Sequence, residues 1–158
     1  MMQHWTPEEC QQGRRLVRFW RQDNAAEDDV IRCHCEPIAQ QDPAATDTNN
    51  TVVSCIYCPD RNDYFITSVD CIYLLESLMN THFGVEEKNR IRRNLEGFRP
   101  ITVAKCKPKS ADFFKLVMSF PHPKPRNIEK DIKAFTWKIL PYALKKIIMK
   151  YTVTSSST

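Results

Sequence analysis

Apolar positions follow two different periods along this chain of 158 residues, and the change between them indicates a mixed fold. Apolar and polar residues alternate over 30–38, and β-rich runs occupy 51–58 and 63–67 on either side of a turn-forming stretch at 59–62. Alternation with period two is typical of strands, and two such runs around a short polar turn predict a hairpin. Other segments repeat their apolar residues every three or four positions, as helices do. The pattern therefore predicts an α+β fold: a small antiparallel sheet with a hairpin, packed by several helices, with the basic helices C-terminal.

A strong start signal predicts the first helix. Thr6 is a suitable N-cap, Pro7 fits the first helical position, and Glu9 completes a capping box. At 100° per residue, apolar residues that include Leu16 and Val17 gather on one side of a helix continued to about residue 22. The neighbouring side of that helix carries Arg14, Arg15, Arg18 and Arg21. We therefore expect one helix with an apolar face and an arginine face.

Two more helices are predicted in the middle of the chain. One begins at Ser68, a suitable N-cap, and buries apolar residues as far as Met79. The other covers 85–97, where a narrow apolar stripe is formed by Ile91, Leu95 and Phe98. The opposite side of this helix carries Arg90, Arg92 and Arg93.

Helices are also predicted on both sides of a proline-rich, extended connector at 121–126. The first follows a short β-like run at 101–105 and begins at Ser110. After the connector, one short apolar helical edge is formed by Ile128, Ile132 and Phe135. A longer helix follows over 136–151, and Pro141 either kinks it or marks its first turn.

The chain has the length and composition of one domain. Its content of 42% hydrophobic and 27% charged residues lies in the globular range. We expect a single α+β domain over 1–151 with a mobile loop at 39–50, and a disordered tail over 152–158. No apolar run approaches the roughly 20 residues that span a bilayer, and the N-terminus does not resemble a signal peptide. We therefore expect no membrane association.

Charge is divided unequally between the two halves of the chain. Residues 1–83 contain 6 Lys and Arg against 13 Asp and Glu, whereas residues 84–158 contain 17 against 6. The formal net charge of +4 therefore conceals a strongly basic C-terminal half. Such an asymmetry indicates a polyanionic partner, and double-stranded DNA fits it best.

The basic half supplies the side chains that DNA recognition needs. Arginine can bind phosphate or guanine, and asparagine can pair with adenine. Any single lysine on a helix is more often only solvated, but few acidic residues interrupt the cluster as a whole. The candidate nucleic-acid-binding residues are Lys88, Asn89, Arg90, Arg92, Arg93, Arg99, Lys105, Lys107, Lys124, Arg126, Lys130, Lys145 and Lys146.

The seven cysteines raise the question of a zinc site. Cys33 and Cys35, with Cys55 and Cys58, provide four thiols that adjacent strands could bring together. However, Cys55 and Cys58 face opposite sides of a strand unless a turn intervenes. With an odd number of cysteines and no signal peptide, we expect free thiols, several of them small core residues, rather than metal ligands or disulfides.

No motif indicates catalysis. The four histidines are not placed near a serine or cysteine in any hydrolase pattern, and the carboxylates form no evident pair. The chain has only three glycines and no glycine-rich phosphate loop, so we expect neither a cofactor nor an enzyme. An aromatic stripe that includes Trp137 and Tyr151 is typical of a core helix. The same stripe is also compatible with a homodimer interface.

Several continuous strings resemble the fungal medusa-type developmental regulators. The central one is residues 87–100, EKNRIRRNLEGFRP, and a second signature spans 120–131. Residues 13–17 and 67–70 also match, so the resemblance covers most of the chain. It implies a nuclear regulator of transcription in fungal development, including sporulation, with this domain inside a longer and otherwise disordered protein. The Cys33 to Cys35 stretch is not part of the pattern, and no catalytic residues are implied.

Three functional hypotheses follow. The first is a nuclear, non-enzymatic domain that binds DNA through its basic C-terminal half, with lysines on phosphates and Arg90, Arg92 and Arg93 reading bases or shape. The second is a protein-interaction module that recruits other transcription regulators and does not read DNA itself. The third is a zinc-dependent enzyme.

Overall fold

The computed structural model describes residues 3–22, 32–39, 51–59, 61–79, 81–104, 106, 108, 110–120 and 131–156. Apart from Ala39, the mobile loop predicted for 39–50 lies outside these residues, and so does the connector at 121–126. The elements are α1 (Pro7–Gln12), β1 (Arg14–Gln22), β2 (Arg32–Ile38), β3 (Thr51–Cys58), β4 (Asp63–Thr67), α2 (Ser68–Leu78), α3 (Val85–Glu96), β5 (Ile101–Val103), α4 (Ala111–Ser119), β6 (Ile132–Thr136), the 3-10 helix η2 (Trp137–Ile139) and α5 (Leu140–Ser156).

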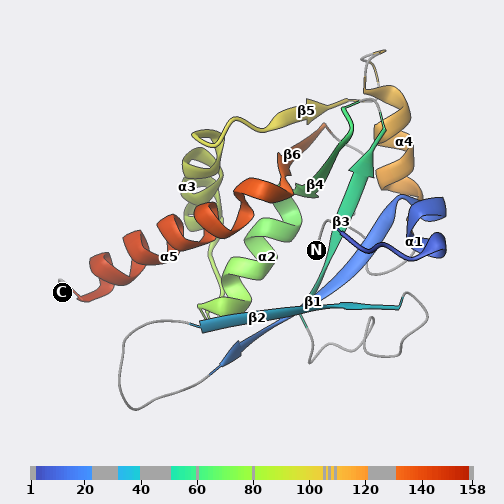
Figure 1. Ribbon diagram of the computed structural model, residues 1–158. Helices are drawn as coiled ribbons and strands as arrows, with labels where there is room; N and C mark the ends of the chain where they lie inside the picture. The colour runs from blue at the N-terminus through green and yellow to red at the C-terminus, as the bar shows by residue number, and fades with distance from the viewer. Residues whose placement is uncertain are drawn as a thin grey trace.

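The fold is α+β, as the sequence predicts, with a six-stranded antiparallel sheet in the order β2-β1-β3-β4-β6-β5. The predicted hairpin is present: β3 and β4 pair with Ile56 opposite Phe65. Helices α2, α3 and α5 lie on one side of the sheet and α4 lies on the other (Figure 1). Both faces of the sheet are therefore buried over much of its width.

The first predicted helix is confirmed only as far as Gln12, and its predicted continuation to residue 22 is wrong. Gly13 ends α1 in the left-handed conformation, with φ +74°, and its N–H donates to the carbonyl of Glu9 at 2.8 Å. The chain then enters β1, where Val17 and Leu16 point into hydrophobic clusters on opposite faces of the sheet. A strand buried on both faces loses the simple alternation of apolar and polar residues. Without that alternation, the spacing of the apolar residues in this segment resembled the period of a helix.

The short helical edge predicted around Ile132 is also wrong, because residues 132–136 form β6 between β4 and β5. Ile132 and Phe135 belong to clusters on opposite faces of the sheet. Ile128, the third member of that edge, lies outside the described residues. Pro141 is the second residue of α5, where its missing N–H breaks no helical hydrogen bond. It therefore marks the first turn of the helix.

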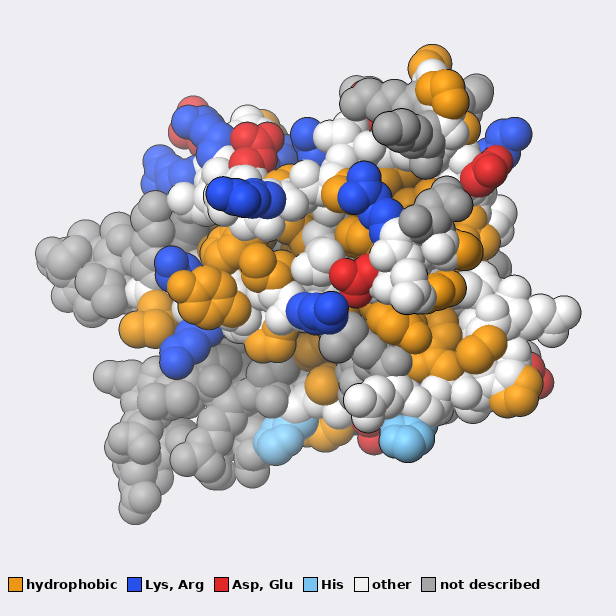
Figure 2. Space-filling model, turned by 45° about the horizontal axis from the view of Figure 1, so that its top comes forward, with side chains coloured by type: hydrophobic (Ala, Val, Ile, Leu, Met, Phe, Trp, Pro, Cys, Tyr) orange, Lys and Arg blue, Asp and Glu red, His pale blue; other side chains and the backbone are white. Residues whose placement is uncertain are grey.

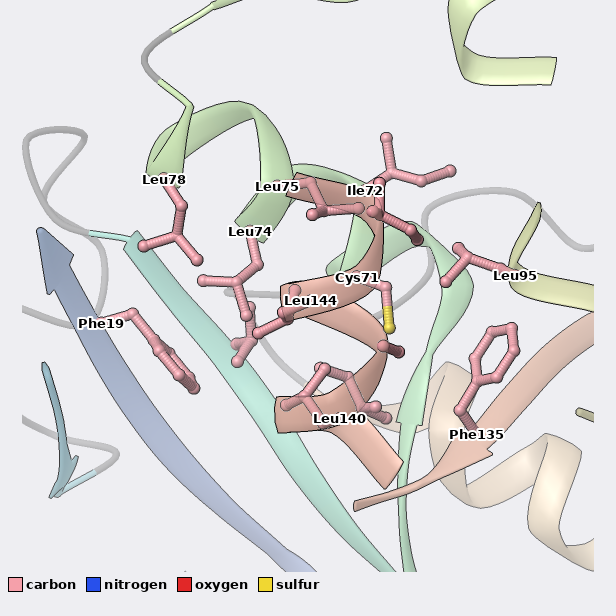
Figure 3. Close-up of a cluster of buried hydrophobic side chains, with 14 of the residues drawn as sticks. Phe19, Cys71, Ile72, Leu74, Leu75, Leu78, Leu95, Phe135, Leu140 and Leu144 are labelled. Carbon is pink, nitrogen blue, oxygen red and sulfur yellow. The ribbon is translucent and has the colours of Figure 1, made fainter. Parts of the chain in front are cut away.

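The larger core fills the space between the sheet and its three covering helices. Leu74 and Leu78 of α2 and Leu144 of α5 gather over Phe19 of β1 (Figure 3). Phe135 of β6 lies in the same cluster. Each fully buried side chain of this size contributes roughly 1.5–3 kcal/mol of transfer free energy. A second cluster lies under α4, around Phe113 and Phe114.

Arg15 belongs to the interior rather than to an arginine face. Its Nε donates to Glu9 Oε2 at 2.9 Å, and its Nη2 donates to Glu9 Oε1 at 3.0 Å. Its Nη1 and Nη2 also donate to the carbonyls of Gln3 and His4, at 3.0 and 2.7 Å. Arg15 therefore joins the N-terminal segment, α1 and the sheet.

Arg14 is fully buried as well, and its guanidinium carbon lies 4.5 Å from the ring centre of Phe120. Burial lowers the pKa of Arg14 to about 10, partly offset by the negative charge of buried Asp70. Asp70 accepts a hydrogen bond from the backbone N–H of Ser54 at 3.1 Å. The Asp70 side chain thus accepts the hydrogen bond of Ser54, a residue of β3 outside the three that pair with β4.

Candidate nucleic-acid interface

Helix α3 is fixed to the molecule by one narrow apolar edge. Ile91 and Leu95 are buried in the larger core, and α3 packs against both α2 and α5. The side of the helix opposite this edge is open to solvent, as the predicted stripe requires. Phe98, the third member of that stripe, is half-buried against the same core. This anchoring decides which side chains of α3 a partner can reach.

The three arginines of the central motif all lie on the exposed part of α3. Arg90, Arg92 and Arg93 are exposed, and so is Asn89. Nη1 of Arg92 donates to Oδ1 of Asn89 at 3.1 Å, one helical turn away. The amide therefore holds one guanidinium in place on the outer surface of the helix.

Lys88 is less suited to a partner than the sequence indicates. Its ammonium lies 3.6 Å from Oε1 of Glu76 on α2, and its side chain is 39% exposed. The other carboxylate oxygen of Glu76 is 3.3 Å from Nδ1 of His82. Lys88 therefore lies on the side of α3 that faces α2, not among the arginines.

Helix α5 extends the basic surface beside α3. Lys145 and Lys146 are exposed on it, and the two helices are in contact (Figure 1). The rings of Phe98 and Tyr142 meet edge to face at 6.0 Å between centres, which joins the end of α3 to α5. The Lys146 ammonium lies 5.0 Å from the centre of the Tyr142 ring. The predicted residues of α3 and α5 thus share one part of the molecular surface.

Arg99 occupies a special backbone position just after α3. It is exposed and has a φ of +56°, a conformation that disfavours most side chains. Its N–H donates to the carbonyl of Glu96 at 3.1 Å, which keeps it close to the end of the helix. The remaining predicted cations lie outside the described residues: Lys105, Lys107, Lys124, Arg126 and Lys130.

Acidic side chains limit the basic surface at both ends of α3. Glu86 and Glu87 are exposed in the first turn, where they complement the helix dipole. Glu96 is exposed in the last turn. The central turns, from Asn89 to Arg93, are therefore the part of α3 that best accepts a polyanion.

The cysteines are not arranged as a zinc site in the described part of the chain. Strand β1 separates β2 from β3, and Cys35 lies opposite Phe19 whereas Cys55 lies opposite Arg15. The prediction that Cys55 and Cys58 face opposite sides is confirmed, since they belong to different clusters. Burial raises the pKa of Cys55 to about 12, so its thiol keeps the proton that a metal would have to displace.

Among the described residues, no group of three His, Cys, Asp or Glu is placed to hold a metal ion. The side chain of Cys33 is outside that set. Within the same residues, no helix has the length and apolarity needed to cross a bilayer.

Sequence reasoning missed one residue of this surface. Tyr142 of α5 is 55% exposed and its ring contacts Phe98 just after α3, but it was not among the candidate binding residues. Its position was readable, because at 100° per residue it falls opposite the buried Leu140 and Leu144. The apolar spacing of α5 indicates only its buried face, so it does not by itself mark Tyr142 as a binding residue.

Comparison with known proteins gives a family but no function. No curated protein and no solved structure matches the chain significantly. A family model described as a domain of unknown function, DUF7082, matches residues 1–148. The chain therefore belongs to the DUF7082 family.

Proposed function

We propose that this chain is a non-enzymatic domain that binds double-stranded DNA in the nucleus and regulates transcription. The observation that carries the proposal is the common exposure of Arg90, Arg92 and Arg93 on a helix fixed by its opposite edge, beside Lys145 and Lys146 of α5. Exposed guanidiniums on a rigid helix can contact phosphates and base edges together.

The resemblance of residues 87–100 to the medusa-type regulators supports a role in fungal development. Ile91 and Leu95 of that string are buried and Phe98 is half-buried, whereas its arginines are exposed. Burial alone explains the apolar positions. The arginines have no comparable role in the described core, so a partner outside the domain best accounts for them.

The two helices take different parts in this proposal. An α-helix fits the major groove, where a bidentate pair between arginine and guanine distinguishes bases by roughly 1–3 kcal/mol. Arg92 and Arg93 are the candidates for that contact. Lys145 and Lys146 supply phosphate contacts, which every DNA sequence offers equally. In this proposal, α3 distinguishes DNA sequences and α5 binds phosphates in any sequence.

Measuring binding of single variants to two kinds of duplex tests this assignment. A preferred site is first selected from a random oligonucleotide pool, and affinities for it and for a random duplex are compared by fluorescence anisotropy. Arg92→Ala or Arg93→Ala should weaken the preferred site by roughly tenfold and the random duplex by less. Lys145→Ala should weaken both alike.

Circular dichroism must show that each variant is folded, since arginine stems also contribute to packing. Equal losses of affinity for both duplexes in the arginine variants would mean that α3 binds phosphates and does not distinguish DNA sequences. Failure of the wild-type protein to bind any duplex at low salt would reject the proposed function.

A further inference from the structure

The outer face of α5 carries two large apolar side chains that the fold leaves uncovered. Tyr142 is 55% exposed and Met149 is 56% exposed. They lie two helical turns apart, about 10 Å along the axis, on the side opposite the buried Leu144 and Ile147. Isolated exposed apolar residues are ordinary, but two on one line of a helix form a stripe that another helix can follow.

Basic residues border this stripe on both sides. At 100° per residue, Lys145 and Lys146 fall on opposite flanks of the line from Tyr142 to Met149, and both are exposed. Figure 2 shows apolar side chains bordered by basic ones on the side of the molecule where α5 lies. The face is thus apolar along its centre and positive at its edges.

One end of the stripe is already held in position. Tyr142 meets Phe98 edge to face at 6.0 Å, and the Lys146 ammonium lies 5.0 Å from its ring centre. A ring fixed on two sides loses little conformational entropy when a partner covers it. The surface therefore has a preorganised aromatic residue at one end and a flexible methionine, which adapts to different partners, at the other.

Charge and polarity decide among the occupants that this face could take. A second copy of the chain, packed through the same face, would bring the lysines of one α5 close to those of the other, and like charges repel. Duplex DNA would satisfy the lysines but would leave Met149 against phosphate or water. An acidic amphipathic helix satisfies both parts, because its apolar side chains cover the stripe and its carboxylates pair with the lysines.

We propose that the outer face of α5 binds an acidic amphipathic helix of a partner protein. The apolar side chains of that helix contact Tyr142 and Met149, and its carboxylates pair with Lys145 and Lys146. This inference goes beyond DNA binding and does not depend on it, because the arginines of α3 are not needed for the apolar contact. The two partners would compete for Lys145 and Lys146, which the proposed function places on DNA phosphates.

A random peptide library displayed on phage and selected against the intact chain provides the probe. Enriched peptides should combine acidic residues with apolar residues spaced three, four and seven positions apart. The best peptide is then synthesised, and its affinity is measured for the wild-type protein, Tyr142→Ser and Met149→Ser. Each variant should lose about tenfold or more, as expected for central residues of an interface.

Tyr73→Ser is the matched control, since Tyr73 is 43% exposed on α2, and it should change peptide affinity by less than about twofold. Arg92→Ala should also leave peptide binding nearly unchanged, which separates this surface from the proposed DNA reader. Peptides without acidic residues, or equal binding to Tyr142→Ser, would overturn the proposal. Loss of duplex affinity in Met149→Ser as large as in Lys145→Ala would assign the face to DNA. Self-association abolished by Met149→Ser would assign it to a second copy.

Discussion

Arg15 shows how a charged side chain can hold a small fold together. Its guanidinium makes four hydrogen bonds, two to the carboxylate of Glu9 and two to the carbonyls of Gln3 and His4. Glu9 has a lowered pKa because, although burial raises it, hydrogen bonds to Arg15 and to the backbone of Thr6 and the charge of Arg15 outweigh that effect. The geometry depends on the planar fork of arginine, which lysine does not have.

Arg15→Lys should therefore destabilise the protein even though the charge is kept. We expect a loss of roughly 2–4 kcal/mol in the free energy of unfolding, because Glu9 and the two carbonyls lose directional donors in a buried setting. Urea denaturation measures this loss. Arg18→Lys is the control: Arg18 is half-buried and makes an ion pair of 3.4 Å with Glu36, so its change should stay below about 1 kcal/mol. Equal losses of unfolding free energy in Arg15→Lys and Arg18→Lys would contradict the structural role of the Arg15 guanidinium.

Asp70 gives stability a specific dependence on pH. Burial raises its pKa from 3.8 to about 7, against the opposing effects of the Ser54 N–H and of Arg14. The folded protein therefore holds a proton between pH 4 and pH 7 that the unfolded chain has released. A raised pKa gives stability that is present at low pH and is lost as the pH rises through about 7.

The free energy of unfolding should accordingly be greater at pH 5 than at pH 7.5, by about 2 kcal/mol from this group. Asp70→Asn keeps an oxygen that can accept the Ser54 hydrogen bond but cannot titrate, so this difference should largely disappear. Urea unfolding of both proteins at the two pH values checks the prediction. Glu9 does not interfere, because its lowered pKa places its titration below the window. The same pH dependence in both proteins would show that Asp70 ionises normally.

At the scale of elements, the junction between α1 and β1 depends on Gly13. A side chain there would meet strain from the φ of +74° and would place its Cβ 3.4 Å from Cδ2 of Leu116. Only glycine adopts this backbone conformation without a steric cost. The residue thus ends the helix and sends the chain into the sheet.

Gly13→Ala should destabilise the protein by about 1–2 kcal/mol. Gly84→Ala offers a matched control, because Gly84 has a φ of −71° and no atom lies within 4 Å of the added Cβ. We expect its effect to be less than about half as large, arising only from its N-cap position. Thermal unfolding of the two variants measures the difference. Similar melting temperatures would show that the left-handed turn is not what defines the junction.

At the scale of the whole molecule, local signals located most elements but not strands β1 and β6. The capping box, the β3–β4 hairpin and the apolar stripe of α3 are each encoded within a few residues, and each prediction is confirmed. Strand β1 was missed because it is buried on both faces, so its apolar and polar residues do not alternate. Strand β6 was missed because its partners β4 and β5 are distant in sequence. No local pattern reports a contact of that kind.

The candidate site could likewise be predicted where it depends on local sequence, but not where it depends on tertiary contacts. The exposure of Arg90, Arg92 and Arg93 could be predicted, since one buried stripe determines the outer side of a helix. The ion pair between Lys88 and Glu76 could not, because it depends on how α3 packs against α2. The contact of Phe98 with Tyr142 likewise depends on the tertiary placement of α3 beside α5.

If the whole basic surface contacts DNA, the salt dependence of binding should report its size. The proposed DNA-binding surface includes six exposed cations of the described residues, namely Arg90, Arg92, Arg93, Arg99, Lys145 and Lys146. Neutralising about six phosphates releases their counterions, so affinity for a random duplex should fall on the order of 10³-fold between roughly 50 and 200 mM salt. Fluorescence anisotropy across that range measures the slope.

Variants then show which cations contribute to that slope. Replacing both Lys145 and Lys146 by glutamine should reduce the slope of log affinity against log salt by about two, because two phosphate contacts are lost. Lys88→Gln is the control, since its ammonium already lies 3.6 Å from Glu76 on the side of α3 that faces α2, and its slope should match the wild type. A wild-type affinity that does not change with salt would mean that the surface does not bind phosphate. A reduced slope for Lys88→Gln alone would place the DNA on the side of α3 next to α2, away from the arginines.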